Sequence, residues 1–188
     1  MTNIKNVNQR DLIAISMMVL ISFFIESTLG LLLIPIISIP LVGGLLSSFF
    51  DAIIIFLGIY LVPRRYSALL FGILLLTLST ITPSFGPPGI YKIGIGLGLG
   101  IIIELLLAIL GRSKWAYVIA TAVAFGSSIP MTYWAWELKG IPTDKLEPYI
   151  FYFIIAYTIL GAIGALAGAW MYEARLKKYR IIKNLREA

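Results

Sequence analysis

The sequence predicts an all-α, polytopic membrane protein with six transmembrane helices and both termini in the cytoplasm. Three observations lead to this prediction. Hydrophobic residues make up 60% of the 188 residues and charged residues 13%, whereas soluble domains average about 45–50% apolar and about 25% charged residues. The apolar residues gather in runs that match a bilayer core of about 30 Å. The basic residues between the runs fall mostly on one side. We therefore expect a single membrane domain, 1–188, in the cell membrane.

Six apolar runs are the predicted spans. In chain order they cover 12–33, 45–62, 67–81, 93–110, 115–138 and 148–172. The first is too long for the apolar part of a signal peptide and contains Glu26, so we expect a retained helix. The third is short for a crossing. The last leads into 173–188, where apolar and basic residues alternate. That spacing predicts an amphipathic helix at the lipid interface, with a docking helix for a cytoplasmic partner as the alternative.

The basic residues orient these spans. Three lie on the side that would face outward: Lys92, Lys139 and Lys145. The other twelve lie on the opposite side: Lys5, Arg10, Arg64, Arg65, Arg112, Lys114, Arg175, Lys177, Lys178, Arg180, Lys183 and Arg186. Cytoplasmic segments carry the excess of Lys and Arg, so the twelve mark the cytoplasmic side. The net charge of +6 thus reflects topology, and we expect the lipid bilayer as a partner, not nucleic acid.

Missing residue types exclude several classes of chemistry. The chain has no Cys and no His, which excludes zinc–thiolate sites, iron–sulfur clusters and Ser-His-Asp hydrolysis. It contains no GxxxxGK[ST] sequence, so it has no P-loop of its own for ATP hydrolysis. Asp51 is the only Asp inside a predicted span, whereas an aspartyl mechanism needs two. We therefore expect no enzyme activity, no metal site and no cofactor.

The connections on the two sides differ in length and composition. The cytoplasmic ones are tight, at 63–66 and 111–114. The outer ones are longer and rich in Pro and Gly: 35–44, 82–92 and 139–147. Function concentrates on such loops, so we expect a site that faces outward. The first outer loop would form a lid over a pocket, marked by Pro35, Pro40, Gly43 and Gly44. An ordinary re-entrant turn is the alternative.

Four carboxylates lie within the predicted spans or at their ends: Glu26, Asp51, Glu104 and Glu137. Ionisable residues inside a bilayer are costly and are functional candidates by default. Lys92 is the one cation near them, and at 1.5 Å per residue it lies about 18 Å from Glu104, too far for a pair. Glu26 or Glu137 is its expected partner. Solvation at headgroup level is the alternative for Glu26 and Glu137. Asp51 and Glu104 need a proton, a hydrogen bond or water.

Aromatic residues cluster in the fifth span and at the start of the sixth: Tyr133, Trp134, Trp136, Tyr149, Tyr152 and Tyr157. An interfacial aromatic belt is one interpretation. Tyr133, Trp134 and Trp136 crowd little more than one helical turn, however, so some of the rings should point into the bundle. Together with Glu137 they predict a pocket for a flat heterocycle. The carboxylate and the rings would also suit a positive charge on that heterocycle.

Small residues recur in two spans. The fourth carries glycine at 94, 96, 98 and 100, and the sixth carries glycine at 161, 164 and 168. Both contain the small-xxx-small spacing that lets helices approach closely. We expect these positions to serve packing within the chain.

Three segments resemble the substrate-binding S components of energy-coupling factor (ECF) vitamin transporters. They are Phe-Gly-Pro-Pro-Gly-Ile-Tyr-Lys at 85–92 with the glycine-rich span and Glu104 after it, Gly-Ala-Ile-Gly-Ala-Leu-Ala-Gly at 161–168, and Pro-Leu-Val-Gly-Gly at 40–44. The resemblance implies a protein that binds a vitamin or precursor in an outward pocket formed by spans four to six and capped by the first outer loop. It also implies a transmembrane coupling protein and two ATPase subunits as partners, and toppling in the membrane to release the substrate.

The residue pattern and this resemblance together give a candidate substrate site: Tyr91, Lys92, Glu104, Tyr133, Trp134, Trp136, Glu137, Tyr152 and Tyr157. The aromatic residues with Glu137 would suit thiamine or its pyrimidine precursor, which we favour. Lys92 would instead suit a carboxylate-bearing vitamin such as biotin.

The resemblance also implies a contact with the coupling protein. Part of the family uses an Ala-x-x-x-Ala surface on the first span, matched here by Ala14, Met18 and Ser22. Met18 departs from the small-residue pattern. The departure argues against the subtype whose members share one coupling module, and against this exact contact, but not against the family.

Two other functions fit the sequence. An MreD-like structural scaffold has a similar six-span layout and needs no pocket, and a Glu104 that only hydrogen-bonds a neighbouring helix would favour it. A small ion-coupled carrier would use Asp51 and Glu104 as a proton or cation relay. An inverted repeat would support a carrier, but spans one to three show no convincing similarity to spans four to six.

Overall fold

The structure, a computed structural model, describes residues 7–33, 42–83, 86–144, 146–179 and 182. Within these ranges every regular element is a helix, which confirms the predicted all-α fold. The α-helices are α1 (Gln9–Leu33), α2 (Val42–Leu61), α3 (Ser67–Leu78), α4 (Tyr91–Leu110), α5 (Lys114–Leu138) and α6 (Ile150–Ala174). Short 3₁₀ helices accompany them: η1 (Ser79–Ile81), η2 (Glu147–Tyr149) and η3 (Leu176–Lys178). The predicted spans fall on these helices and differ from them by a few residues at the ends.

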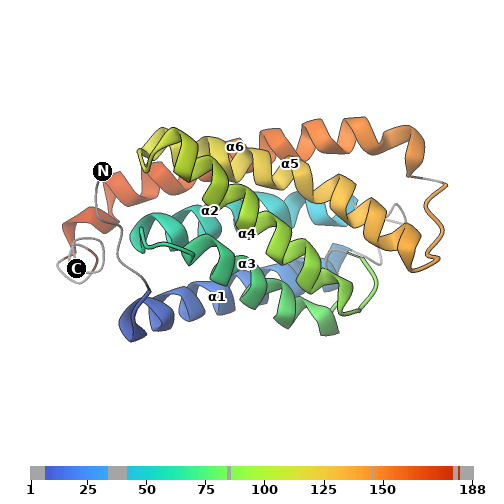
Figure 1. Ribbon diagram of the computed structural model, residues 1–188, viewed down its shortest axis with the longest axis horizontal. Helices are drawn as coiled ribbons and strands as arrows, with labels where there is room; N and C mark the ends of the chain where they lie inside the picture. The colour runs from blue at the N-terminus through green and yellow to red at the C-terminus, as the bar shows by residue number, and fades with distance from the viewer. Residues whose placement is uncertain (1–6, 34–41, 84–85, 145, 180–181, 183–188) are drawn as a thin grey trace.

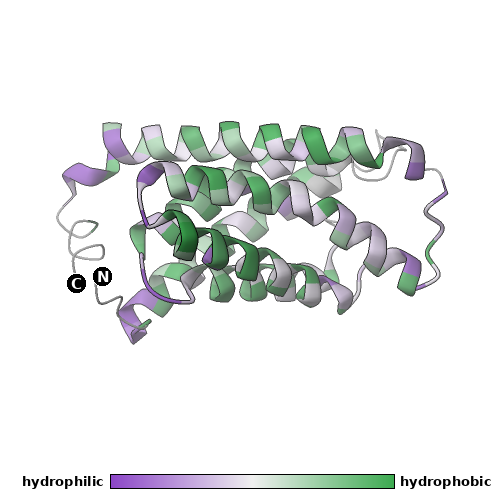
Figure 2. Ribbon diagram, turned by 45° about the horizontal axis from the view of Figure 1, so that its top comes forward, coloured by the Kyte–Doolittle hydropathy of each residue, from purple (hydrophilic) through white to green (hydrophobic). Residues whose placement is uncertain are grey.

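The helices lie side by side in an elongated bundle (Figure 1). α1 begins and α6 ends at the same end of the bundle, which we call the near end. The α2–α3 and α4–α5 connections also lie there. α4 begins and α5 ends at the opposite end, which we call the far end. Figure 2 shows hydrophobic residues along the helices and hydrophilic residues gathered towards the two ends. A bundle that crosses a bilayer requires this banding.

Five helices are long and apolar enough to cross a membrane: α1, α2, α4, α5 and α6. α3 has 12 residues, and at 1.5 Å per residue it is about 18 Å long, against about 30 Å for a bilayer core. η1 follows directly and extends this apolar segment to Ile81. The described residues thus contain five candidate spans where the sequence predicted six, consistent with a multi-pass membrane protein.

α2 and α5 are the most buried helices, whereas α1, α4 and α6 expose much of their apolar surface. The exposed side chains recur at helical spacing on the outer faces: Ile13, Met17, Leu20 and Phe24 on α1, and Leu97, Ile101, Leu105 and Ile109 on α4. A helix that is apolar on its outer face as well as its inner face is typical of contact with lipid.

Glycines allow close contacts between the helices. A Cβ on Gly96 of α4 would collide with the backbone of Gly72 on α3. On α6, Gly164 and Gly168 lie against the backbone of α2 at Phe49 and Ile53. The prediction that the glycine patterns serve packing within the chain is confirmed at these positions.

The end of the chain differs from its prediction. α6 ends at Ala174, and the short helix η3 follows Arg175. The segment 173–179 is therefore not a continuous amphipathic α-helix. Leu176 packs against the hydrophobic core. The rest of the predicted tail, apart from Ile182, lies outside the described residues.

Candidate functional site

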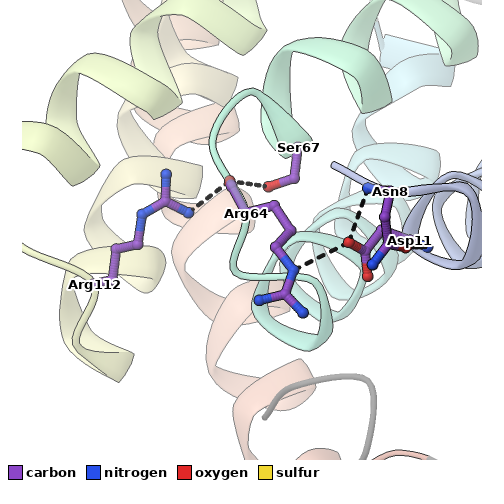
Figure 3. Close-up of polar contacts among 5 residues, drawn as sticks. All are labelled: Asn8, Asp11, Arg64, Ser67 and Arg112. Carbon is purple, nitrogen blue, oxygen red and sulfur yellow. Dashed lines mark hydrogen bonds and ion pairs between the residues drawn. The ribbon is translucent and has the colours of Figure 1, made fainter. Parts of the chain in front are cut away.

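A buried ion pair fastens the start of α1 to the α2–α3 connection (Figure 3). Arg64 Nε lies 3.0 Å from Asp11 Oδ2, and both side chains are buried. Asn8 and Asp11 cap each other, since the Asn8 N–H donates to Asp11 Oδ2 at 3.2 Å and the Asp11 N–H donates to Asn8 Oδ1 at 2.9 Å. This reciprocal pattern satisfies free N–H groups at the helix start. It also holds Asp11 in position for Arg64.

The same connection is tied to α4 and to the α4–α5 loop. The Arg64 carbonyl accepts hydrogen bonds from Arg112 Nη1 at 2.8 Å and from Ser67 Oγ at 3.1 Å. Arg112 Nη2 pairs with Glu104 Oε2 at 2.9 Å. Glu104 Oε1 accepts from the Ala68 N–H at 3.1 Å. We call these residues the near-end network: Asn8, Asp11, Arg64, Ser67, Glu104 and Arg112. Each carboxylate in it faces a guanidinium, which is the arrangement of a structural fastening.

A second group of buried polar residues lies deeper in the bundle. We call it the core cluster: Ser22, Glu26, Asp51, Ser79, Lys92 and Tyr157. Each of these residues exposes at most 1% of its surface. They come from α1, α2, η1, α4 and α6, so the cluster depends on tertiary packing.

Hydrogen bonds join the core cluster across helices. Ser22 Oγ donates to Asp51 Oδ1 at 2.5 Å. Ser79 Oγ lies 3.2 Å from each carboxylate oxygen of Glu26. Lys92 Nζ donates to the carbonyls of Ser79 at 3.0 Å and Thr82 at 2.7 Å. Glu26 also attracts Lys92 electrostatically. Of the two partners expected for Lys92, the one that lies with it is Glu26.

Asp51 borders a small internal cavity. Its second carboxylate oxygen, Oδ2, is buried and has no hydrogen-bond partner among the described residues. The cavity has a volume of about 30 Å³ and lies between α2, α3, α4 and α5. Its lining is apolar apart from Asp51 and Ser128. A space of this size holds one water molecule.

A larger, open groove lies at the far end, between the start of α4 and the end of α5. Its volume is about 330 Å³, and its lining residues are Tyr91, Gly94, Ile95, Met131, Trp134, Ala135, Leu138 and Lys139. Small-molecule sites usually measure about 300–1,000 Å³. The Trp134 side chain is 69% exposed, so its ring is available to a ligand. Of the described residues that line the groove, Lys139 is the single charged one.

Hydrogen bonds fix one wall of this far-end groove. Trp136 Nε1 donates to Tyr91 Oη at 3.2 Å, and Tyr91 Oη donates to the Pro87 carbonyl at 2.6 Å. Gly86, with φ of 93°, lies so close to the Trp136 ring that a Cβ would collide with it. The positive φ and the close approach both require glycine here. The segment that carries the resemblance therefore builds the wall beside Tyr91.

The structure divides the predicted substrate residues among separate places. Lys92 and Tyr157 belong to the core cluster, and Glu104 belongs to the near-end network. Tyr91 and Trp134 line the far-end groove, and Trp136 supports it. The remaining three line neither the groove nor the internal cavity: Tyr133, Glu137 and Tyr152. Within the described residues, no single pocket gathers all nine.

The predicted lid lies mostly outside the described residues, which exclude Pro35 and Pro40. Gly43 and Gly44 belong to the start of α2. Gly44 lies against the Tyr157 hydroxyl, so this end of the predicted lid borders the core cluster.

The three residues of the predicted contact face for a coupling protein differ in burial. Ser22 is fully buried and donates a hydrogen bond to Asp51. Ala14 and Met18 pack against the chain's own hydrophobic core. Ala14 and Met18 are only half-buried, and the contact with a coupling protein stays a prediction.

Sequence reasoning missed Ser79 and the fastening role of Asp11 and Arg64. The spacing Asn8-x-x-Asp11 resembles a capping box and was a usable signal for the start of α1. Ser79 gave no such signal, because its contact with Glu26 spans 53 residues of sequence.

Comparison with protein-family models, curated proteins and solved structures gave no match.

Proposed function

We propose that this chain is the substrate-binding membrane subunit of an ECF-type importer, which takes up a vitamin or precursor from outside. A separate transmembrane coupling protein and two ATPase subunits would supply the energy, since the sequence has no P-loop. The far-end groove carries the proposal. It combines an available indole ring, a hydrogen-bonded Tyr91 and a volume suited to a small ligand.

The proposal includes an orientation and a sixth span. The near end faces the cytoplasm, because eight of the described basic residues lie there: Arg10, Arg64, Arg65, Arg112, Lys114, Arg175, Lys177 and Lys178. α3 with η1 serves as a short sixth crossing, which places both termini on the cytoplasmic side. The groove then opens on the outer side, where substrate arrives.

The groove residues have distinct roles in this proposal. Trp134 offers a flat ring on which a heterocycle stacks. Tyr91, held by Pro87 and Trp136, fixes the edge of the site. Lys92 directly follows Tyr91 in the sequence. Its ammonium group donates hydrogen bonds to the carbonyls of Ser79 and Thr82. A ligand that moves Tyr91 therefore acts on the joint between α4 and the segment after α3.

The charge of the groove bears on the choice of vitamin. Among the described residues, its lining holds Lys139 and no carboxylate. Glu137, which favoured a thiamine-type cation at the level of sequence, lies outside that lining. A substrate with a carboxylate, such as biotin, therefore fits the groove better than thiamine does.

Ligand-induced stabilisation of the purified protein in detergent tests the proposal. Biotin, thiamine and the thiamine pyrimidine are added separately, and the melting temperature is measured. A ligand at one hundred times its Kd stabilises the folded state by about 2.7 kcal/mol. We expect at least one vitamin to raise the melting temperature and Trp134→Ala to abolish the rise.

Trp170→Ala is the matched control. Trp170 is 68% exposed, against 69% for Trp134, but it lies on α6 away from the groove. This variant should keep the full ligand effect. If a broad set of vitamins leaves the wild-type melting temperature unchanged, the importer proposal fails. If Trp134→Ala keeps the effect, the site lies elsewhere.

An MreD-like scaffold remains a second candidate because of one observation. Among the described residues, Glu104 bonds only the neighbouring α3 backbone and Arg112, which is the structural role that a scaffold would give it. The two functions differ in ligand binding. A scaffold predicts no vitamin-dependent stabilisation in the experiment above.

A further inference from the structure

We propose that the core cluster is a proton-binding site and that Asp51 carries the bound proton in the folded protein. This inference is independent of the importer proposal, because it concerns the protein without substrate. It rests on the charges, hydrogen bonds and cavity of the buried residues in the middle of the bundle.

Among the described residues, one carboxylate oxygen of Asp51 accepts a hydrogen bond and the other does not. Ser22 Oγ donates to Oδ1 at 2.5 Å. Oδ2 is buried and lacks a donor among the described residues. An ionised carboxylate is a pure acceptor, and a buried one without enough donors is costly. A proton on Oδ2 removes this cost and turns the oxygen into a donor.

The charges of the cluster also favour a proton on Asp51. Glu26 and Asp51 supply two carboxylates, and Lys92 supplies one ammonium group. The charged neighbour that acts on Asp51 is Glu26, which repels its anion. Lys92 is attracted to Glu26 and donates to two backbone carbonyls. The ammonium charge is thus matched by Glu26, so the second negative charge needs one further positive charge.

The elements packed around Asp51 supply no such charge among the described residues. α1 contributes Ser22 and Glu26, and α6 contributes Tyr157, which is neutral or anionic. α3, α4 and α5 line the cavity beside Asp51 with uncharged residues, of which Ser128 is the polar one. A proton is the smallest cation that meets the need. A metal ion would need several oxygen ligands, whereas no group of three acidic residues suited to metal lies in the described part of the chain.

The cavity gives the proton an acceptor and a path. It lies beside Asp51 and measures about 30 Å³, which is enough for one water molecule. A water there accepts a hydrogen bond from the protonated Oδ2 and reaches Ser128. Proton exchange at Asp51 would then change the net charge of the core by one unit, in a region where α1, α2 and α6 meet.

Infrared spectroscopy of the purified protein at neutral pH tests this inference. A protonated carboxyl group has a C=O stretch well separated from the carboxylate bands. We expect this band in the wild type, a shift on exchange into heavy water, and a further shift when aspartate labelled at its side-chain carboxyl carbon is incorporated. The labelling needs no variant, so it stands even if substitutions at Asp51 impair folding.

Variants then assign the band to one residue. Asp51→Asn should remove it. Asp144→Asn, at an exposed Asp in the α5–η2 loop, should leave it unchanged, as should Glu104→Gln in the near-end network. Absence of the band overturns the inference. A band that shifts with labelled glutamate instead places the proton on a glutamate and overturns the assignment to Asp51.

Salt substitution separates a proton from a metal cation. The melting temperature is compared in sodium chloride and in choline chloride at equal ionic strength. We expect the two values to agree. A sodium-specific stabilisation that disappears in Asp51→Asn would show that sodium occupies the cluster, and the proton assignment would be wrong.

Discussion

The near-end network and the core cluster are both polar, the first partly buried and the second fully buried, and they balance their charges differently. At the near end, Asp11 faces Arg64 at 3.0 Å and Glu104 faces Arg112 at 2.9 Å. In the core cluster, two carboxylates share one lysine, and Asp51 Oδ2 has no donor among the described residues. A buried ion left unmatched is costly, so it marks a place where another species binds. The balanced region fastens the helices, and the unbalanced one can respond to a cation.

Substitution of Arg64 gives the sharpest test of the fastening role. Arg64→Ala leaves Asp11 buried without its cation and frees the α2–α3 connection from α1. Removal of one partner of a buried pair costs about 3–5 kcal/mol. We expect a loss of this size in the free energy of unfolding, measured in mixed detergent micelles.

Arg65→Ala is the control for Arg64. Arg65 is exposed and lies 5.2 Å from the centre of the Tyr66 ring. Loss of such a contact costs at most about 1 kcal/mol. If the two adjacent substitutions have equal effects, the near-end network does not fasten the fold, and the contrast with the core cluster disappears.

Two glycines of α4 test the packing that closes the cavity beside Asp51. Gly96→Ala would push a methyl group into the backbone of Gly72, and such overpacking costs about 1–3 kcal/mol. Gly94 has open space around its Cα, so Gly94→Ala should stabilise the helix by about 0.5–1 kcal/mol. Thermal unfolding of the two variants should therefore shift in opposite directions. A shift in the same direction would mean that α3 and α4 are less closely packed than the structure has them.

The helices were predictable from the sequence because each depends on a local run of apolar residues. The start of α5 at Lys114 and the end of α1 at Leu33 fall within one residue of their predicted places. The tail departs from its prediction at 175–179, where a short 3₁₀ helix follows α6 and Leu176 packs against the core.

The candidate site was predictable only in part. Tyr91 and Trp134 were both among the predicted residues, and both line the groove. The position of Trp136 against Gly86, and the inward turn of Ser22, depend on how α1, α2, α4 and α5 pack against one another. Helical spacing fixes which residues share a face, but it does not fix which neighbour that face meets.

Glu104 is the predicted site residue whose place in the structure differs most from its prediction. The sequence placed it in the substrate site, whereas the structure pairs it with Arg112 at the near end. Glu104→Gln keeps an acceptor for the Ala68 N–H but loses the charge, and hydrogen bonds to charged groups contribute about 1.5 kcal/mol or somewhat more. We expect a loss near this value, with the vitamin-induced rise in melting temperature intact.

Arg112→Met should cost more, because it also releases the Arg64 carbonyl. The double variant should cost less than the sum of the two, since the residues share one contact. A Glu104→Gln protein that keeps its stability and loses the ligand effect would return Glu104 to the substrate site. A residue near the cytoplasmic end of α4 would then take part in ligand binding, in addition to the residues at its far end.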